Sequence, residues 1–208
     1  MDDTRWRALE QERLSLAALL EDLTSAQWET PSLCVLWRVR DVAAHVAMTP
    51  TAPTTPTLLR RLAAARGNLW SAGAQIAIDH ARRPTAQIIE QLRRDAAART
   101  MPRITNPDNL LMDAVVHGQD IAVPLGTTRL VPAEAGRAAF DRVWGMGWPF
   151  HARRRLAGLR LVATDADIDV GEGPVVEGEL RFLLLLVTGR TEAAVPHLRG
   201  AGLERVSA

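Results

Sequence analysis

The stretch DNLLMDAVVHGQDIAVPLG, residues 108–126, decides the fold at the centre of this 208-residue chain. Its apolar residues recur at helical spacing, which predicts a buried helix over about 107–123, before a proline and a glycine stop it. Within this helix Asp113 precedes His117 by four residues, so both side chains share one face. The spacing suits half of a metal site, and equally an ordinary polar pair in a buried helix.

The same periodicity recurs through the first 150 residues, where apolar positions repeat at intervals of three and four. The proline-rich segment TPTAPTTPT, residues 49–57, is expected to be a loop, neither helix nor central strand. Five or six helices joined by loops indicate a helical bundle. Besides the central helix, the pattern predicts helices over about 5–23, 39–48, 58–80, 85–99 and 132–144.

The last sixty residues have a different pattern. Two short strand-like runs, 159–163 and 168–170, flank a turn rich in Asp. A short apolar helix over 179–187 follows, and the tail HLRGAGLERV is expected to add a final strand. We therefore expect a mainly α protein with two domains: a helical bundle over 1–150 and a small α+β domain over 151–208.

Composition excludes several function classes. The 25 basic residues oppose 24 acidic ones, and HARRRL is the single sustained basic run, so no nucleic-acid partner is expected. All the basic residues are Arg, which excludes a Lys nucleophile or Schiff base. The one cysteine, Cys34, can form neither an internal disulfide nor a four-thiolate zinc site.

Nothing in the chain resembles a membrane segment. The start, MDDTRWRALEQER, is charged and lacks the apolar core of a signal peptide, and the longest apolar run, FLLLLV, is too short to span a bilayer. We expect a soluble, cytoplasmic protein with no membrane partner. The oligomeric state is not determined by the sequence.

A metal bound between helices needs a ligand on one helix that faces two ligands on another. Asp113 and His117 supply such a pair, and His45, within the apolar DVAAHVAM, supplies a candidate third ligand. Asp120, three residues after His117, could accept a hydrogen bond from its imidazole as a supporting residue, or pair with an arginine. The alternatives are a core histidine bonded to a backbone carbonyl and a solvated carboxylate near a helix end.

Two segments in the expected order, LTSAQWETPSLCVLWRVRDVAAHVA and DAVVHGQDIAVPLG, resemble the mycothiol-dependent maleylpyruvate isomerase family of DinB-like metal-binding bundles. The later GLRLVATDADIDVGEG looks like that family's small domain, which is related to sterol-carrier folds. The resemblance implies metal ligands at His45, Asp113 and His117, with mycothiol as cofactor. The chain departs from the family where Asp113 replaces glutamate, and where CVLW replaces a Pro-Gly pair between Cys34 and Trp37.

Two imidazoles and one carboxylate favour Zn²⁺ and leave open positions, as in a catalytic site. The hypothesis is a metal-dependent transferase or isomerase that uses a small-molecule thiol, mycothiol, and attacks a small electrophilic substrate through a metal-bound thiolate. No catalytic or cofactor-binding residue beyond the metal ligands can be named. The alternatives are a non-catalytic binding module of the same fold and a metal-dependent hydrolase in which water replaces the thiol.

Overall fold

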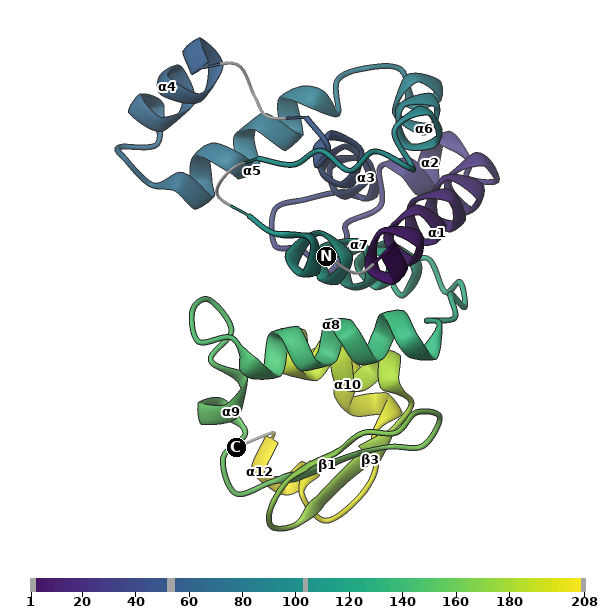
Figure 1. Ribbon diagram of the computed structural model, residues 1–208, viewed down its shortest axis with the longest axis vertical. Coiled ribbons are helices and arrows are strands. Elements are labelled where there is room, and N and C mark those ends of the chain that lie inside the picture. Colours follow the sequence, from purple (N-terminus) through teal and green to yellow (C-terminus); the bar gives the residue numbers. More distant parts are fainter. Residues whose placement is uncertain (1–2, 52–54, 103–104, 207–208) are drawn as a thin grey trace. The chain divides into compact units, whose positions relative to one another are not determined.

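The structure, a computed structural model, describes residues 3–51, 55–102 and 105–206, and it divides into two compact units, Met1–Leu110 and Leu111–Ala208 (Figure 1). Helices dominate the described residues, with one small sheet in the second unit. None of the described helices combines the length and the apolar composition needed to cross a membrane. The domain boundary expected at residue 150 stays a prediction.

The first unit is helical. Within it α3 packs against α5 and α6, and α1 packs against α6 (Figure 1). Its buried core is formed mainly by leucine, valine, isoleucine and alanine side chains that recur at helical spacing. Its helices are α1 (Asp3–Glu21), α2 (Ser25–Trp28), α3 (Val39–Met48), α4 (Thr55–Ala64), α5 (Leu69–His80) and α6 (Thr85–Arg94).

A buried arginine explains why the helix expected over 85–99 already ends at Arg94. The side chain of Arg13 is 1% exposed and donates hydrogen bonds to the carbonyls of Asp95, Ala96 and Ala98 at 3.1–3.3 Å. These carbonyls accept hydrogen bonds from a guanidinium on α1, so they do not need the N–H donors that a further turn of α6 would supply. Burial lowers the pKa of Arg13 to about 10, partly opposed by the charge of Asp95.

Two predicted boundaries in the first unit were wrong. The helix expected over 58–80 is divided into α4 and α5 by a turn in which Arg66 and Gly67 have positive φ angles of 51° and 83°. The loop expected over 49–57 is helical from Thr55, because Pro56 occupies the first turn, where no N–H donor is needed. Residues 52–54 lie outside the described residues.

The second unit packs helices on one face of a three-stranded sheet of order β2-β1-β3. Strand β1 (Arg160–Ala163) pairs antiparallel with β2 (Asp169–Gly171) and parallel with β3 (Val175–Gly178). Helix α10 (Leu180–Val187) contacts β1, β3 and α8 (Ala133–Gly145), and nearly all of its side chains are buried (Figure 1). The other helices are α7 (Pro107–Ala122), which begins in the first unit, α9 (Ala152–Arg155), α11 (Thr191–Ala194), the 3₁₀ turn Val195–His197 and α12 (Leu203–Val206).

The C-terminal tail corrects a further prediction. The expected final strand is absent from the described residues of the tail: Arg199 forms an isolated bridge with Glu177, and α12 follows. Gly200 has a φ of 111° and lies against the carbonyl oxygen of Val175, so the chain turns away from the sheet there. Instead, the parallel partner of β1 is β3, which the sequence pattern did not predict.

Candidate functional site

Helix α7 carries the predicted polar pair, with buried apolar residues between the two positions. The side chains of Asp113 and His117 lie one turn apart, with 3.9 Å between Asp113 Oδ1 and His117 Nε2. Both are partly exposed, at 32% and 12%, whereas most of the intervening residues are buried. The structure therefore presents a carboxylate oxygen and an imidazole nitrogen together on one face of α7.

Asp120 holds the other side of the His117 ring. Its Oδ2 lies 2.8 Å from His117 Nδ1, and its side chain is fully buried. Arg190, which follows α10, donates to both oxygens of Asp120, from Nε at 3.0 Å and from Nη2 at 2.8 Å. The two contacts that the sequence offered as alternatives for Asp120, with an imidazole and with an arginine, both occur. Whether Asp120 supports a metal ligand stays a prediction.

The charge of Asp120 follows from these contacts. Burial acts to raise the pKa of Asp120, but the hydrogen bond from His117 and the charge of Arg190 outweigh it and lower the pKa well below its usual range. An ionised Asp120 can only accept hydrogen bonds, so His117 must carry its proton on Nδ1 when the ring is neutral. The lone pair of Nε2 then points to the Asp113 side of the ring.

Arg190 is the residue that sequence reasoning missed. It lies 70 positions from Asp120, and nothing in VTGR distinguishes it from the other 24 arginines. The available signal was an acidic residue in the last turn of α7, where the helix dipole disfavours negative charge. That position required a compensating cation, although the sequence could not say which one.

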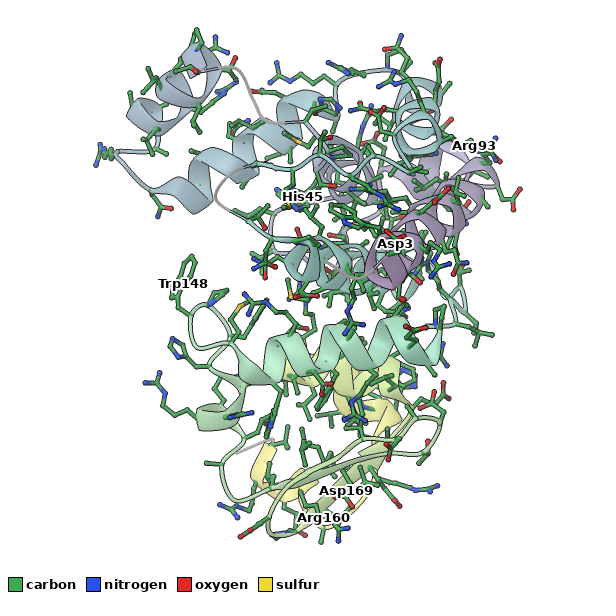
Figure 2. The ribbon with its side chains drawn as sticks, viewed as in Figure 1. Asp3, His45, Arg93, Trp148, Arg160 and Asp169 are labelled. Carbon is green, nitrogen blue, oxygen red and sulfur yellow. The ribbon has the colours of Figure 1, made fainter. Side chains whose placement is uncertain are left out.

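His45 lies on α3 in the first unit, half-buried among alanine and valine neighbours (Figure 2). Its ring centroid is 5.2 Å from that of Trp37, at an interplanar angle of 44°. The start of α3 is fixed by Arg38, which donates to Asp41 from its backbone nitrogen and its guanidinium. His45 belongs to Met1–Leu110 and the α7 pair to Leu111–Ala208, so the grouping of the three residues stays a prediction.

The CVLW segment before α3 forms a tight turn. The backbone N–H of Trp37 donates to the carbonyl of Cys34 at 3.0 Å, and Leu36 has a φ of 68°. Glycine is favoured at this third position of a turn, because a positive φ strains a residue with a Cβ atom. Val35 and Leu36 are 89% and 92% exposed. The chain thus keeps the turn that a Pro-Gly pair would favour, with two apolar residues at its tip.

Taken together, a helical first unit and an α+β end of the chain define a helical-bundle protein with a small C-terminal domain. Residues 9–110 match the family described as the mycothiol maleylpyruvate isomerase N-terminal domain. This match places residues 9–110 in the mycothiol-dependent maleylpyruvate isomerase family and confirms the family predicted from the sequence.

Two solved structures are similar to the chain: a mycothiol-dependent maleylpyruvate isomerase, at 16% identity and a TM-score of 0.57, and a histidine-to-alanine mutant of such an isomerase, at 13% identity and a TM-score of 0.59. Each alignment covers 96% of this chain and 92% of the other. At this identity the likeness shows a shared fold, and it confirms the predicted fold class. A search of curated proteins gave no match.

Proposed function

We propose that His45, Asp113 and His117 bind a divalent metal ion, with Zn²⁺ favoured, and that the protein is a thiol-utilising transferase or isomerase that depends on mycothiol. The observation that carries the proposal is the state of His117: Asp120 holds Nδ1 at 2.8 Å, and Nε2 lies 3.9 Å from Asp113 Oδ1. A histidine that ligates a metal through one nitrogen usually donates its other N–H to a carboxylate or carbonyl.

The donor spacing on α7 fits a tetrahedral ion. Two ligands about 2.0–2.1 Å from such an ion lie roughly 3.4 Å apart, so the Asp113 and His117 atoms need only a small side-chain adjustment. Aspartate in place of glutamate shortens the carboxylate arm and would place the ion closer to α7. His45 would supply the remaining protein ligand from α3.

A bound dication would lower the pKa of a coordinated thiol and so supply a thiolate nucleophile. The chain's own residues would do the rest of the positioning. Asp120 and Arg190 would fix the tautomer and orientation of His117, and the ionised Asp120 would keep Nε2 available as a ligand. Asp113 would contribute the one negative charge of the ligand set, which would leave the ion with a net positive charge.

Mycothiol as the thiol, and a small electrophile with an activated double bond as the substrate, are supported by the family of the N-terminal domain. In an isomerase the thiol adds to a cis alkene, the bond rotates, and elimination returns the thiol. In a transferase the thioether adduct is the product. The two outcomes differ in whether the thiol is consumed.

The test is thiol-dependent turnover of maleylpyruvate and simple unsaturated carbonyl compounds by the full chain, reconstituted with Zn²⁺. We expect turnover that requires mycothiol and is lost in His117→Ala and His45→Gln. His197→Gln is the matched control, because His197 stacks on Phe182 at 4.0 Å and is not a proposed ligand. Turnover without added thiol would replace this proposal with the hydrolase, and binding of thiol without turnover would replace it with the binding module.

A further inference from the structure

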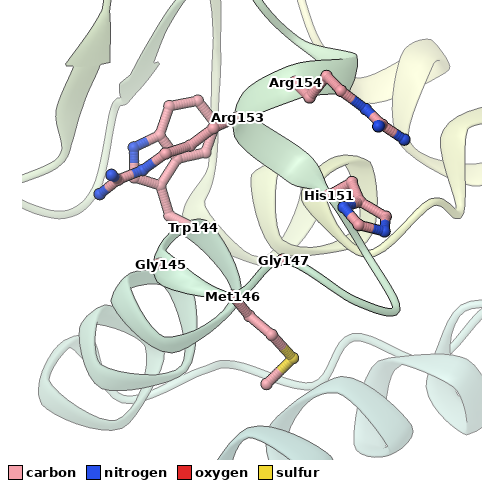
Figure 3. Close-up of a pocket in the computed structure, with 7 residues that line it drawn as sticks. All are labelled: Trp144, Gly145, Met146, Gly147, His151, Arg153 and Arg154. Carbon is pink, nitrogen blue, oxygen red and sulfur yellow. The ribbon is translucent and has the colours of Figure 1, made fainter.

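A pocket in the second unit lies between the end of α8 and α9 (Figure 3). In the sequence its residues are separate from those proposed for the metal site. Its volume is about 180 Å³. Among the described residues no acidic side chain lines it, and its walls carry basic, aromatic and thioether groups. The lining residues are Trp144, Gly145, Met146, Gly147, His151, Arg153 and Arg154.

The two arginines of this pocket differ from their neighbours in the same unit. Arg155, the next residue, donates to the carbonyls of Phe150, Leu186 and Val187. Other arginines of the unit bind carboxylates, as in the pairs Arg160–Asp169, Arg181–Glu179 and Arg199–Glu177. Within the described part of the chain, the side chains of Arg153 and Arg154 have no hydrogen bond or ion pair. Their donors remain available to an anion.

The guanidinium of Arg153 is held in place by the pocket's aromatic wall. Its Cζ atom lies 5.9 Å from the ring centroid of Trp144, and the two side chains lie beside each other in Figure 3. Stacking on an indole face restrains the guanidinium plane and leaves its N–H edge exposed. That edge has the spacing of two parallel donors, which a carboxylate can accept together.

His151 adds a second feature typical of a binding site. Its backbone is left-handed, with φ 47° and ψ 36°, a conformation that is strained for a residue with a Cβ atom. Strain of this kind tends to be kept where it positions a functional group. Here the imidazole lies beside Gly147, where a Cβ atom would stand 3.9 Å from Nδ1, so the ring lines the pocket.

We propose that this pocket binds a small organic carboxylate, with its charged end on Arg153 and its apolar body against Trp144. The volume equals roughly six waters at about 30 Å³ each, which is below the 300–1,000 Å³ of pockets for drug-sized ligands. The ligand must therefore be small. The site gives a function to HARRRL, the one sustained basic run in the sequence, and it requires no metal.

The test is isothermal titration calorimetry of the full chain, treated with a chelator, with benzoate and separately with inorganic phosphate. We expect saturable benzoate binding that weakens about tenfold or more when Arg153→Gln and Arg154→Gln are combined, because each removes a charged donor. Trp144→Leu should weaken benzoate binding more than phosphate binding. Arg199→Gln, which removes the same charge from an ion pair with Glu177, should leave benzoate binding unchanged.

The proposal is overturned by three outcomes: no saturable benzoate binding, an equal loss in Arg199→Gln, or phosphate binding as tight as benzoate binding with no effect of Trp144→Leu. The last outcome would indicate general attraction of anions. If circular dichroism shows that the double glutamine variant is unfolded, Arg153→Lys with Arg154→Lys replaces it. This variant keeps the charge but loses the paired donors, so benzoate affinity should still fall.

Discussion

His117 Nδ1 lies 2.8 Å from Asp120 Oδ2, and the same oxygen accepts a hydrogen bond from Arg190 Nη2 at 2.8 Å. This chain of contacts links the predicted metal-binding face of α7 to the residue that follows α10. Because Asp120 is fully buried, both of its partners are needed to stabilise the charge.

Asp120→Asn should weaken metal binding and stability together. The neutral amide of asparagine cannot offset the charge of Arg190. It is also a weaker hydrogen-bond acceptor for the Nδ1–H group of His117 than a carboxylate. We expect metal affinity to fall about 10- to 100-fold, as for other partners of ligating histidines, and the free energy of unfolding to fall by about 3 kcal/mol. Chelator competition and urea denaturation measure the two effects. An unchanged metal affinity would mean that Asp120 serves only the fold.

Leu36→Gly should stabilise the protein. Leu36 has a φ of 68° and is 92% exposed, so glycine relieves backbone strain and loses almost no burial. We expect a gain of roughly 0.5–1 kcal/mol in the free energy of unfolding, measured by urea denaturation. The control is Leu130→Gly, also an exposed leucine at 76% but without a positive φ, which should destabilise slightly. Destabilisation by Leu36→Gly would show that the side chain contributes to the fold.

Gly118→Ala should destabilise the second unit. A Cβ atom at this position in α7 would lie 2.5 Å from Nη1 and 2.8 Å from Cζ of Arg129, whose side chain is buried and has little room to move. We expect a loss of about 1–3 kcal/mol. Gly73→Ala in α5 is the control, because its Cβ would meet nothing within 4 Å and alanine favours the helix. Thermal denaturation of both variants should therefore move the Tm in opposite directions.

His80 should make the protein less stable in mild acid. Burial, aided by the nearby charge of Arg83, lowers the pKa of His80 below its ordinary value, although its 2.8 Å hydrogen bond with Gln91 acts the other way. In the unfolded chain His80 is protonated near pH 6.5, whereas in the folded chain protonation of His80 requires a lower pH. The loss of stability is therefore absent above about pH 7 and grows as the pH falls. His80→Gln should reduce the loss of stability between pH 7.5 and 5.5 in urea denaturation. The same loss in wild type and variant would exclude this role.

Much of the helical fold follows from local pattern. The apolar spacing of α1, α3, α7 and α8 predicted these helices to within a few residues, because burial of one face determines them. The errors lie where distant groups intervene. Helix α6 ends early because Arg13 binds the carbonyls that follow it, and the parallel pairing of β3 with β1 depends on a crossover that no local pattern specifies.

The candidate site could be predicted only in part for the same reason. The spacing of Asp113, His117 and Asp120 is a property of one helix, so the sequence contained it. Arg190 comes from a loop 70 residues away, and the pocket between α8 and α9 depends on the backbone of His151. Such features arise from tertiary packing, which the spacing of residues does not encode.

Elemental analysis of the full chain, after reconstitution with Zn²⁺ and removal of free metal, tests the proposed metal site. We expect one ion per chain, retained in His197→Gln and lost in His117→Ala and in His45→Gln. A wild-type chain that holds no stoichiometric ion, or a His117→Ala variant that keeps it, would contradict the proposed site.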